Sequence, residues 1–441
     1  MRRNLLTYLL LFLLFQTGYA QDTFRILGNA RSYAVSFKFI NNLIVIPIEV
    51  NGTALNFILD TGVDNTLLFN LSVEDSLRLK EIQTIRIRGL GEGAYFDALK
   101  SSNNFFKFGN VVNGNHMAYV IPGKNFDFSS RMGFDVNGII GGDIFKNFIV
   151  EINYNSKRIK FHDPAQYVYK KCSKCVDVPL EFYNEKPFLN LKIHPEKAVT
   201  ATVKLLIDTG GSDALWLFEK THEKIDVPEK NFEDFLGLGL GGNIHGRRSK
   251  IGEIELGNYV IRDVNVAYPD SAAVEYAYLN KERNGSIGSE LIKRFNVIFD
   301  YSNKKMTITG RSRYFNDPFV HNMSGIELTH NGSILVSERQ NNLLQGDANE
   351  NTYATVQILY SYVYALKPSF RIAAIRKNSP AYNAGLQVGD IVLEVNNKPA
   401  YEYKLEEIIH LFSTKEGKEI RLLIQRGGRE LNYSFTLQKM I

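Results

Sequence analysis

Two short apolar runs, each followed by the same tripeptide, mark the first three hundred residues of the chain. Phe57-Ile58-Leu59 runs into Asp60-Thr61-Gly62, and Leu205-Leu206-Ile207 runs into Asp208-Thr209-Gly210. An apolar run bounded by turn residues predicts a buried strand, so each aspartate is expected at the end of a strand. One such tripeptide would indicate only a turn, but two copies suggest two carboxylates that meet at one site.

The sequence around the two tripeptides repeats as well. Residues 145–159 correspond to residues 292–306, and each stretch predicts the end of a short helix, a strand, a polar turn and a second strand. An apolar-Gly step precedes each stretch, at Gly141 and at Gly288. It lies 141 − 60 = 81 residues after the first aspartate and 288 − 208 = 80 residues after the second. We therefore predict two mainly β lobes of similar build.

Each lobe also carries a glycine-rich segment after its tripeptide, at residues 89–93 and 237–242. A phosphate-binding loop would require a helix directly after the glycines, and no such pattern follows. Alternating apolar residues such as Ile85 and Ile87 indicate a strand instead. Because glycine tolerates positive φ, we predict that both segments are flexible tips of β-hairpins.

The last third of the chain has a different pattern. Polar residues at 337–351 predict an exposed loop. After it, Pro380 suits the first position of a helix and Gly385 its end, and a strand is expected over 391–395. Apolar residues then recur at helical spacing, at Leu405, Ile408, Ile409 and Phe412.

Two further strands are expected near 420–425 and 431–437, so this stretch predicts a compact α/β module of one small domain. We place the first lobe at 21–165, the second lobe at 166–320 and the α/β module at 321–441. The predicted fold class is mainly β, with two homologous lobes related by a pseudo-twofold axis and a C-terminal α/β domain.

The N-terminus has the pattern of a secretory signal peptide. Arg2 and Arg3 give a positive start, residues 9–15 lie in an apolar core, and Gly18-Tyr19-Ala20 ends the core with small residues. An uncleaved membrane anchor is the alternative, but the core is short for a bilayer span of about 20 residues. We expect residues 1–20 to be removed and the protein to be exported, to the periplasm or outside the cell.

Composition changes this picture little. The 44% hydrophobic and 22% charged residues are typical of a soluble globular protein without a further membrane span. The net charge of +5 becomes 5 − 2 = +3 without the two arginines of the signal peptide. That charge is too small to favour nucleic acid or a membrane surface as a partner.

The chain has two cysteines, Cys172 and Cys175, in a polar stretch between the lobes. In an exported chain such a pair predicts a local disulfide. Half of a zinc site is an alternative, but no second pair completes it, and the polar surroundings disfavour a thioredoxin-like redox motif. We assign this pair no chemistry and expect no metal.

The paired aspartates suggest a mechanism if the lobes pack about a pseudo-twofold axis. The hydroxyls of Thr61 and Thr209 would then bond to the backbone of the opposite lobe, and Gly62 and Gly210 would let the chain turn tightly. Two carboxylates in such a site repel each other by about 4 kcal/mol at an effective dielectric near 20. The pair therefore holds one proton over a wide pH range.

Such a pair can hydrolyse a peptide bond. The charged member takes a proton from water, and the neutral member donates its proton to the carbonyl oxygen of the peptide. This chemistry requires no metal and no other cofactor. The competing chemistries lack their motifs, since Ser286 and Ser289 lie in no Gly-x-Ser-x-Gly sequence and the histidines form no His-Glu-x-x-His pattern.

At these residues the chain resembles the aspartic peptidases, through apolar-apolar-Asp-Thr-Gly followed after 81 or 80 residues by apolar-apolar-Gly. The short lobes are similar to fused retroviral-type (retropepsin-like) units, and the chain resembles bacterial two-lobed aspartyl proteases with a C-terminal PDZ domain. The resemblance implies that Asp60 and Asp208 are the catalytic dyad and that the segments near Gly91 and Gly239 are flaps over the substrate. The supporting residues that it implies are Thr61, Gly62, Thr209 and Gly210.

The chain departs from this family pattern beside each aspartate. Val63 and Gly211 stand where many pepsin-like enzymes have Ser or Thr. Without these hydroxyls the aspartates lose hydrogen bonds that favour ionisation, so we expect a less acidic optimum than that of pepsin-like enzymes. A pH–rate profile that peaks below about pH 3 would contradict this. Asp64 would contact substrate backbone or an internal arginine, although Gly142 stands where that arginine is expected. The second lobe has Ser212 at the position equivalent to Asp64, so we expect unequal substrate subsites in the two lobes.

The C-terminal module resembles a bacterial PDZ domain through Ser379-Pro380-Ala381, Ala384-Gly385-Leu386 and Gly389-Asp390. Such domains bind extended peptides by strand addition and hold C-terminal carboxylates in a nest of backbone amides. The candidate carboxylate loop is residues 323–326, so Gly325 and Ile326 would contact the ligand.

The sequence thus predicts an exported aspartic endopeptidase that acts on proteins or peptides, with a C-terminal peptide as candidate ligand of the PDZ domain. We expect a monomer, because one chain supplies both halves of the site. The alternative is a catalytically silent peptide-binding adaptor on the same fold, which would not require both aspartates. An autoinhibitory or localising role of the PDZ domain is compatible with the first prediction.

Overall fold

The computed structural model describes residues 23–71, 77–91, 95–123, 128–196, 199–344 and 357–441. The predicted signal peptide lies outside these residues. The chain divides into two compact units, and the second unit consists of residues 129–134 together with 320–440. The sequence pattern places residues 129–134 in the first lobe, whereas the structure groups them with the C-terminal module.

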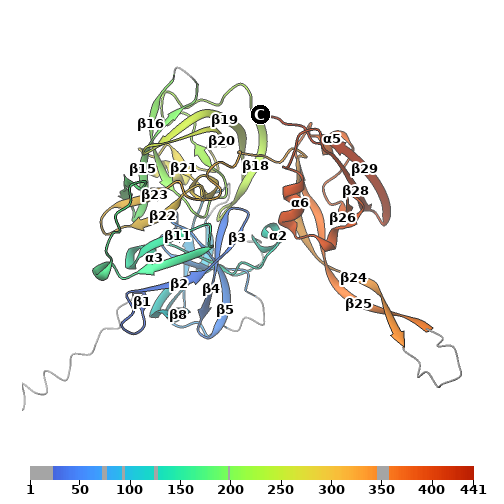
Figure 1. Cartoon of the computed structure of the whole chain (residues 1–441), viewed down its shortest axis with the longest axis horizontal. Helices are drawn as coiled ribbons and strands as arrows, with labels where there is room; N and C mark the ends of the chain where they lie inside the picture. Colours follow the sequence, from blue (N-terminus) through green and yellow to red (C-terminus); the bar gives the residue numbers. More distant parts are fainter. Residues whose placement is uncertain (1–22, 72–76, 92–94, 124–127, 197–198, 345–356) are drawn as a thin grey trace, which may run out of the picture. The chain divides into compact units, whose positions relative to one another are not determined.

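The first lobe is built on a nine-stranded sheet (Figure 1). Its strands pair as β-hairpins and in short parallel pairs, and each strand packs one face against the core, as the apolar runs predict. In sheet order the strands are β1 (Arg25–Ile26), β9 (Val111–Val120), β6 (Thr66–Leu68), β10 (Gly138–Ile140), β5 (Thr53–Leu59), β4 (Leu43–Val50), β8 (Phe96–Phe108) and β7 (Gln83–Ile87), with β3 (Lys38–Ile40) paired to β4.

The second lobe repeats this plan in an eight-stranded sheet. In sheet order its strands are β14 (Glu181–Tyr183), β15 (Lys186–His194), β16 (Ala201–Ile207), β21 (Gly285–Ile287), β17 (Leu215–Leu217), β20 (Tyr259–Pro269), β19 (Gly242–Leu256) and β18 (Phe232–Gly239). Short helices α3 (Gly142–Asn147) and α4 (Ser289–Ile292) follow the two apolar-Gly steps at matching places. The 3₁₀ turns η1 (Pro164–Gln166) and η2 (Glu275–Leu279) lie in connections.

A third sheet of six strands joins the lobes. Its strands, in order, are β13 (Val176–Pro179), β23 (Lys305–Thr309), β22 (Asn296–Asp300), β11 (Ile149–Asn153), β12 (Arg158–His162) and β2 (Ser32–Ser36).

The two repeated stretches meet at the centre of this third sheet. Val150 of β11 lies opposite Phe299 of β22, and Ile152 lies opposite Val297. In the repeat, Val150 corresponds to Val297 and Ile152 corresponds to Phe299. Exchanging the two lobes therefore turns the Val150–Phe299 pair into the Val297–Ile152 pair. The pairing is therefore two-fold symmetric, and one core of buried apolar side chains runs through both lobes.

The second unit has its own sheet and its own core. Two long strands, β24 (Ile326–Leu344) and β25 (Gln357–Ile375), form the paired ribbon drawn in orange in Figure 1. The sheet continues through β26 (Ile391–Val395), β28 (Glu419–Arg426) and β29 (Arg429–Thr436), with β27 (Lys398–Pro399) on β26. Its helices are α5 (Pro380–Asn383), η3 (Ala400–Glu402) and α6 (Leu405–Leu411).

The exposed loop predicted from residue 337 is wrong as far as Leu344, where β24 ends. These polar residues pair with β25, for example Ser337 with Tyr364. Leu335 and Leu366, which pair nearby, are 67% and 72% exposed. Because solvent reaches both faces of this ribbon, the alternation that marks a half-buried strand is missing from the sequence. Residues 345–351 of the predicted loop lie outside the described residues.

Cys172 and Cys175 form the predicted local disulfide, between η1 and β13. Within the described residues, no helix is long and apolar enough to cross a membrane.

Candidate active site

Both aspartates stand directly after the buried strands that the sequence predicts, Asp60 after β5 and Asp208 after β16. Each strand pairs in parallel with the short strand of its apolar-Gly step, β10 or β21. The amide of Asp60 donates to the carbonyl of Ile140 at 2.9 Å, and that of Asp208 to the carbonyl of Ile287 at 2.9 Å. The same local structure therefore holds each carboxyl group.

Two buried threonines connect the lobes directly beneath the aspartates. The hydroxyl of Thr61 donates to the carbonyl of Ile207 at 2.7 Å and accepts from the amide of Thr209 at 3.1 Å. The hydroxyl of Thr209 donates to the carbonyl of Leu59 at 2.9 Å and accepts from the amide of Thr61 at 3.0 Å. These are the bonds across the two-fold axis that the sequence predicts, and they fix the two tripeptides against each other.

The two glycines that end the tripeptides lie against the carboxyl groups. A Cβ atom on Gly62 would lie 3.1 Å from Asp60 Oδ1 and 3.1 Å from Asp208 Cγ, and one on Gly210 would lie 2.2 Å from Asp60 Oδ2. The amides of Gly62 and Gly210 donate to Asp60 Oδ1 at 2.6 and 3.1 Å. Because one glycine adjoins both carboxyl groups, the structure brings Asp60 and Asp208 together at one place.

The two carboxyl groups have different surroundings. Asp60 is 7% exposed, whereas Asp208 is half-buried. Burial, followed by the neighbouring charge of Asp208, raises the pKa of Asp60 to about 8, against the opposing effects of the Gly62 amide and Lys186. The neutral form is therefore favoured at Asp60, as expected for two carboxyl groups that share one proton.

Two cations that the sequence did not single out act on this pair. Lys186 begins β15, and its charge opposes the rise in the pKa of Asp60. Arg283 is 8% exposed, and burial lowers its pKa only to about 10, so it stays charged beside Asp208. Its Nε donates to the carbonyl of Gly285 at 3.1 Å. No sequence motif identifies either cation, because Lys186 lies in β15 and Arg283 in the connection before β21, both far in sequence from the tripeptide whose aspartate they act on.

Three polar residues next to the tripeptides were also missed. The hydroxyl of Ser289 donates to the carbonyl of Thr209 at 2.9 Å. Asn137 and Asn284 occupy the same place in the repeat, and their side-chain oxygens accept from backbone amides of β5 and β16 at 3.1 and 2.8 Å. For the asparagines a signal was present, because Asn-Gly-x-Ile-Gly occurs in both lobes.

The two glycine-rich segments meet each other. The amide of Gly241 donates to the carbonyl of Leu90 at 2.7 Å, and the amide of Gly91 donates to the carbonyl of Ala273 at 2.9 Å. A Cβ atom on Gly239 would lie 2.1 Å from the oxygen of Leu90. The Leu90 side chain, like that of Trp216, packs against two clusters of buried apolar residues in the second lobe, which include Phe218, Leu236 and Ile244. Gly91 and Gly239 thus lie where two hairpins, β7–β8 and β18–β19, touch.

Asp64 and Ser212 differ in environment. Asp64 is partly buried, and burial raises its pKa against the opposing charges of Lys186 and Lys146. Ser212 is exposed, and its carbonyl accepts from the side chain of Asn42 at 3.0 Å. The two lobes therefore present unequal surfaces at these positions.

An arginine–aspartate pair of the kind expected near Asp64 is present in the second lobe. Arg248 of β19 donates to Asp213 at 2.8 Å and to Asp234 of β18 at 2.8 Å. The indole of Trp216 donates to the second oxygen of Asp213 at 2.7 Å. Because Asp213 follows the second tripeptide closely, this cluster links the β18–β19 hairpin to the loop that carries Asp208.

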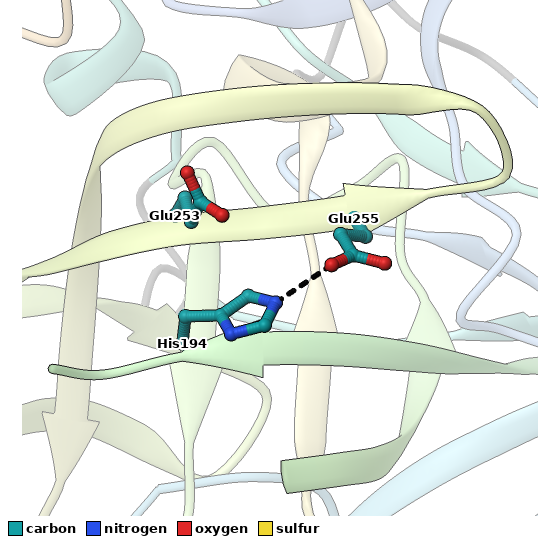
Figure 2. A group of neighbouring side chains, drawn as sticks. All are labelled: His194, Glu253 and Glu255. Carbon is teal, nitrogen blue, oxygen red and sulfur yellow. Dashed lines mark hydrogen bonds and ion pairs between the residues drawn. The ribbon is translucent and has the colours of Figure 1, made fainter. Parts of the chain in front are cut away.

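Among the described residues, one group of side chains is close enough to hold a metal ion: His194, Glu253 and Glu255 (Figure 2). Both ring nitrogens of His194 already have partners, Glu255 at 2.8 Å and Thr200 at 3.0 Å. These bonds account for the cluster without an ion. It lies 194 − 186 = 8 residues along β15 from Lys186, or about 26 Å at 3.3 Å per residue. It therefore has no part in the aspartate site.

The remaining predicted ligand residues, Gly325 and Ile326, belong to the second unit. They lie where β24 begins, and both are buried. Gly325 has φ +79°, and a Cβ atom there would lie 2.2 Å from Ser379 Cβ. Only glycine fits this position.

The sequence matches two protein families. Residues 46–144 and 199–291 match the family described as aspartyl protease, and residues 371–426 match the PDZ domain. The two aspartyl protease segments contain the two Asp-Thr-Gly tripeptides and the two apolar-Gly steps.

The similar curated proteins share only a short stretch with this chain. A protein of Lactococcus lactis named as a zinc metalloprotease is 35% identical over 69 residues, 16% of each chain. The serine endoprotease DegS of Salmonella typhimurium is 34% identical over 65 residues, 15% of this chain and 18% of that one. This chain thus spans less than a fifth of the length of these relatives.

Among solved structures, the aspartic proteinase from Irpex lacteus is 12% identical, with a TM-score of 0.41. The superposition covers 65% of this chain and 99% of that one.

Proposed function

Because this chain is an aspartyl protease with a PDZ domain, we propose that it is an endopeptidase in which Asp60 and Asp208 activate a water molecule against a peptide bond. The observation that carries the proposal is the approach of both carboxyl groups to Gly62, above the threonines that bond the lobes together. This arrangement gives the substrate one acid and one base at the same place.

We assign the shared proton to Asp60. Its burial and its raised pKa support this choice, and the charge of Arg283 supports an ionised Asp208. Asp208 would take a proton from water while the water oxygen forms a bond to the carbonyl carbon. Asp60 would donate its proton to the carbonyl oxygen. Asp208 would then donate its proton to the leaving nitrogen, while Asp60 takes a proton back from a hydroxyl of the tetrahedral diol. The C–N bond breaks, the two products leave, and the pair again holds one proton on Asp60.

We propose that the hairpins that meet at Leu90 and Gly241 are flaps that open to admit substrate. Support comes from their contact with each other and from the glycines at their tips. The PDZ domain would recognise peptide or protein segments, since domains of this family bind extended peptides by strand addition. A free C-terminus is one form that such a segment can take.

We further propose that the protein is exported and acts as a monomer. The pattern of residues 1–20 supports export, and the disulfide of Cys172 with Cys175 suits an oxidising compartment. N-terminal sequencing of the mature protein is expected to begin at Gln21. A mature protein that begins at Met1 would contradict removal of the signal peptide.

The dyad can be tested with Asp60→Asn and Asp208→Asn in a cleavage assay on a denatured protein substrate. Each change removes one half of the acid–base pair, so we expect kcat to fall by at least about 10²-fold. Asp263→Asn is the matched control. Asp263 is exposed on β20 and has φ 53°, a conformation that asparagine tolerates. Full activity in either dyad variant would refute the proposal.

A further inference from the structure

A six-residue segment from the protease part of the chain belongs to the PDZ unit. Residues 129–134 lie in the connection between β9 and β10, yet they group with residues 320–440. The helix α2 (Phe128–Met132) begins just before this segment, and Phe128 itself packs on Phe69 of the first lobe, with ring centroids 5.6 Å apart. The PDZ unit is thus assembled from two distant parts of the sequence.

The segment contacts the PDZ unit at the edge of its sheet. β24 is the last strand in the sheet order, and α6 packs beside it. Arg131 forms an ion pair with Glu327 of β24. A Cβ atom on Gly133, which has φ +65°, would lie 2.7 Å from Leu405 Cβ of α6 and 3.5 Å from His330 Nε2 of β24. We call Glu327, His330 and Leu405 the β24–α6 edge.

The chemistry of these contacts is specific. The side chains of Arg131 and Glu327 are 28% and 27% exposed, so their pair is partly shielded from solvent. A residue with a Cβ atom would not fit at Gly133, both because of the space and because of the positive φ. The β24–α6 edge therefore receives the end of the short helix α2, with Arg131 facing Glu327, and the turn after it, with Gly133 against Leu405.

The loop expected to hold a peptide carboxylate is already satisfied internally. The amides of Ser324 and Gly325 donate to Asn322 Oδ1 at 3.0 and 3.2 Å, and the hydroxyl of Ser324 donates to the same atom at 2.7 Å. The amide of Ile326 donates to the hydroxyl oxygen of Ser324 at 3.0 Å. Asn322 thus takes the place that a carboxylate oxygen would take in a nest of backbone amides.

We propose that the β24–α6 edge is a binding site for an internal, arginine-bearing chain segment, and that residues 129–134 are its resident ligand. An outside protein segment of the same chemistry would have to displace this ligand, and a free C-terminus is not required. This inference depends on the PDZ assignment and is independent of the proposed peptidase chemistry.

The proposal can be tested by fluorescence anisotropy on the full chain carrying Asp208→Asn, so that cleavage does not disturb the measurement. The probe is a labelled peptide with the sequence of residues 128–135 and an amidated C-terminus. Arg131→Glu removes the resident ion pair and places like charges together. We expect it to raise the affinity for the probe at least about tenfold, because juxtaposed like charges cost more than the lost pair.

Three controls make the result specific. Arg421→Glu makes the same charge change in β28 of the PDZ unit, where Arg421 pairs with Glu419, and should leave the affinity unchanged. Glu327→Gln added to Arg131→Glu should remove most of the gain. A probe with alanine in place of its arginine should bind at least about tenfold more weakly than the original.

If the probe binds too weakly for anisotropy, hydrogen exchange provides a second measurement of whether residues 129–134 have left the β24–α6 edge. Amides of residues 129–134 and of β24 should exchange faster in Arg131→Glu than in the parent chain, with the remaining PDZ amides unchanged. Unchanged affinity together with unchanged exchange would overturn the proposal. Tighter binding, by tenfold or more, of the same probe with a free carboxylate would also overturn it, since a carboxylate nest would then be the main determinant.

Discussion

At the scale of single residues, the two halves of the site are chemically unequal. Asp60 is buried and receives two glycine amides, whereas Asp208 is half-buried and lies near Arg283. The amides favour a charged Asp60, but its burial and the neighbouring Asp208 outweigh them. In the proposed reaction, this inequality would make Asp60 the acid and Asp208 the base from the first step.

This inequality predicts how stability depends on pH. The pKa of Asp60 rises from an ordinary value of 3.8 to about 8 on folding. Between these values the folded chain holds a proton that the unfolded chain has lost, so the free energy of unfolding falls as pH rises. The side chain in Asp60→Asn is neutral at every pH, so the variant does not show this fall in the free energy of unfolding. Between about pH 4 and pH 8 the variant should therefore gain at least about 1.4 kcal/mol relative to wild type, the worth of one pK unit.

Urea unfolding at several pH values measures this difference. Asp263→Asn, with its exposed side chain, should give a difference from wild type that does not change with pH. If the Asp60→Asn difference is equally flat, the pKa of Asp60 is not raised in the folded protein.

The sequence identified the residues that carry a motif and missed those that act through the fold. Asp60 and Asp208 stand out because their tripeptides repeat. Lys186 and Arg283 carry no such mark, because a single cation in a chain with 52 lysines and arginines has no pattern around it. Their approach to the aspartates depends on strand pairing across the lobe, which local sequence does not specify.

At the scale of elements, one cluster connects a hairpin to the loop of Asp208. Arg248 bridges Asp213 and Asp234, and all three side chains are about one-fifth exposed, at 19%, 19% and 22%. Removing one partner of such a cluster leaves the other charges poorly solvated. The β18–β19 hairpin should therefore depend on Arg248 for its position.

We expect Arg248→Met to lower the free energy of unfolding by roughly 1–3 kcal/mol, less than for a fully buried cluster because solvent reaches it. Chemical denaturation followed by fluorescence of Trp216, which bonds to Asp213, reports on this cluster. The matched change Arg86→Met removes a pair with Asp97 whose side chains are 71% and 75% exposed, and it should cost less than about 0.5 kcal/mol. If both variants lower the free energy of unfolding equally, the Arg248 cluster stabilises the fold no more than an exposed ion pair.

Strands that bury one face were predictable, whereas the long ribbon was not. β5 and β16 end at the predicted residues because their apolar runs are continuous. β24 continues through polar residues because its partner β25 supplies the backbone hydrogen bonds, and no side-chain pattern records that pairing. The error in that prediction thus arose where tertiary pairing determines the structure.

At the scale of the whole molecule, the described residues form two large, separate cores. One core is continuous through both protease lobes, and the other fills the PDZ unit. The internal repeat made the two lobes predictable. The membership of residues 129–134 in the PDZ unit was not predictable, because nothing in those six residues distinguishes a segment that packs on the PDZ unit from an ordinary loop of the first lobe.

Two matched substitutions test this division. Phe299 lies in the shared core of the lobes and Phe370 in the PDZ core, and both are 0% exposed. Each change to alanine should cost about 3–5 kcal/mol in its own unit. In mild denaturant, Phe299→Ala should speed amide hydrogen exchange in both lobes and leave exchange in the PDZ unit unchanged. Phe370→Ala should speed exchange in the PDZ unit and leave the lobes unchanged. Loosening of the second lobe alone by Phe299→Ala would contradict a common core.

The threonine bonds between the lobes also mean that the site can form only late in synthesis of the chain. A ribosome releases Thr61 first, Thr209 148 residues later, and Ser289, which steadies Thr209, 80 residues after that. Under the proposed export from the N-terminus, Asp60 would therefore leave the cell before Asp208, and without the threonine bonds that the second lobe supplies. In the proposed mechanism, which requires both aspartates, the chain would be unable to cleave other unfolded proteins during export and would become active only after the second lobe has folded against the first.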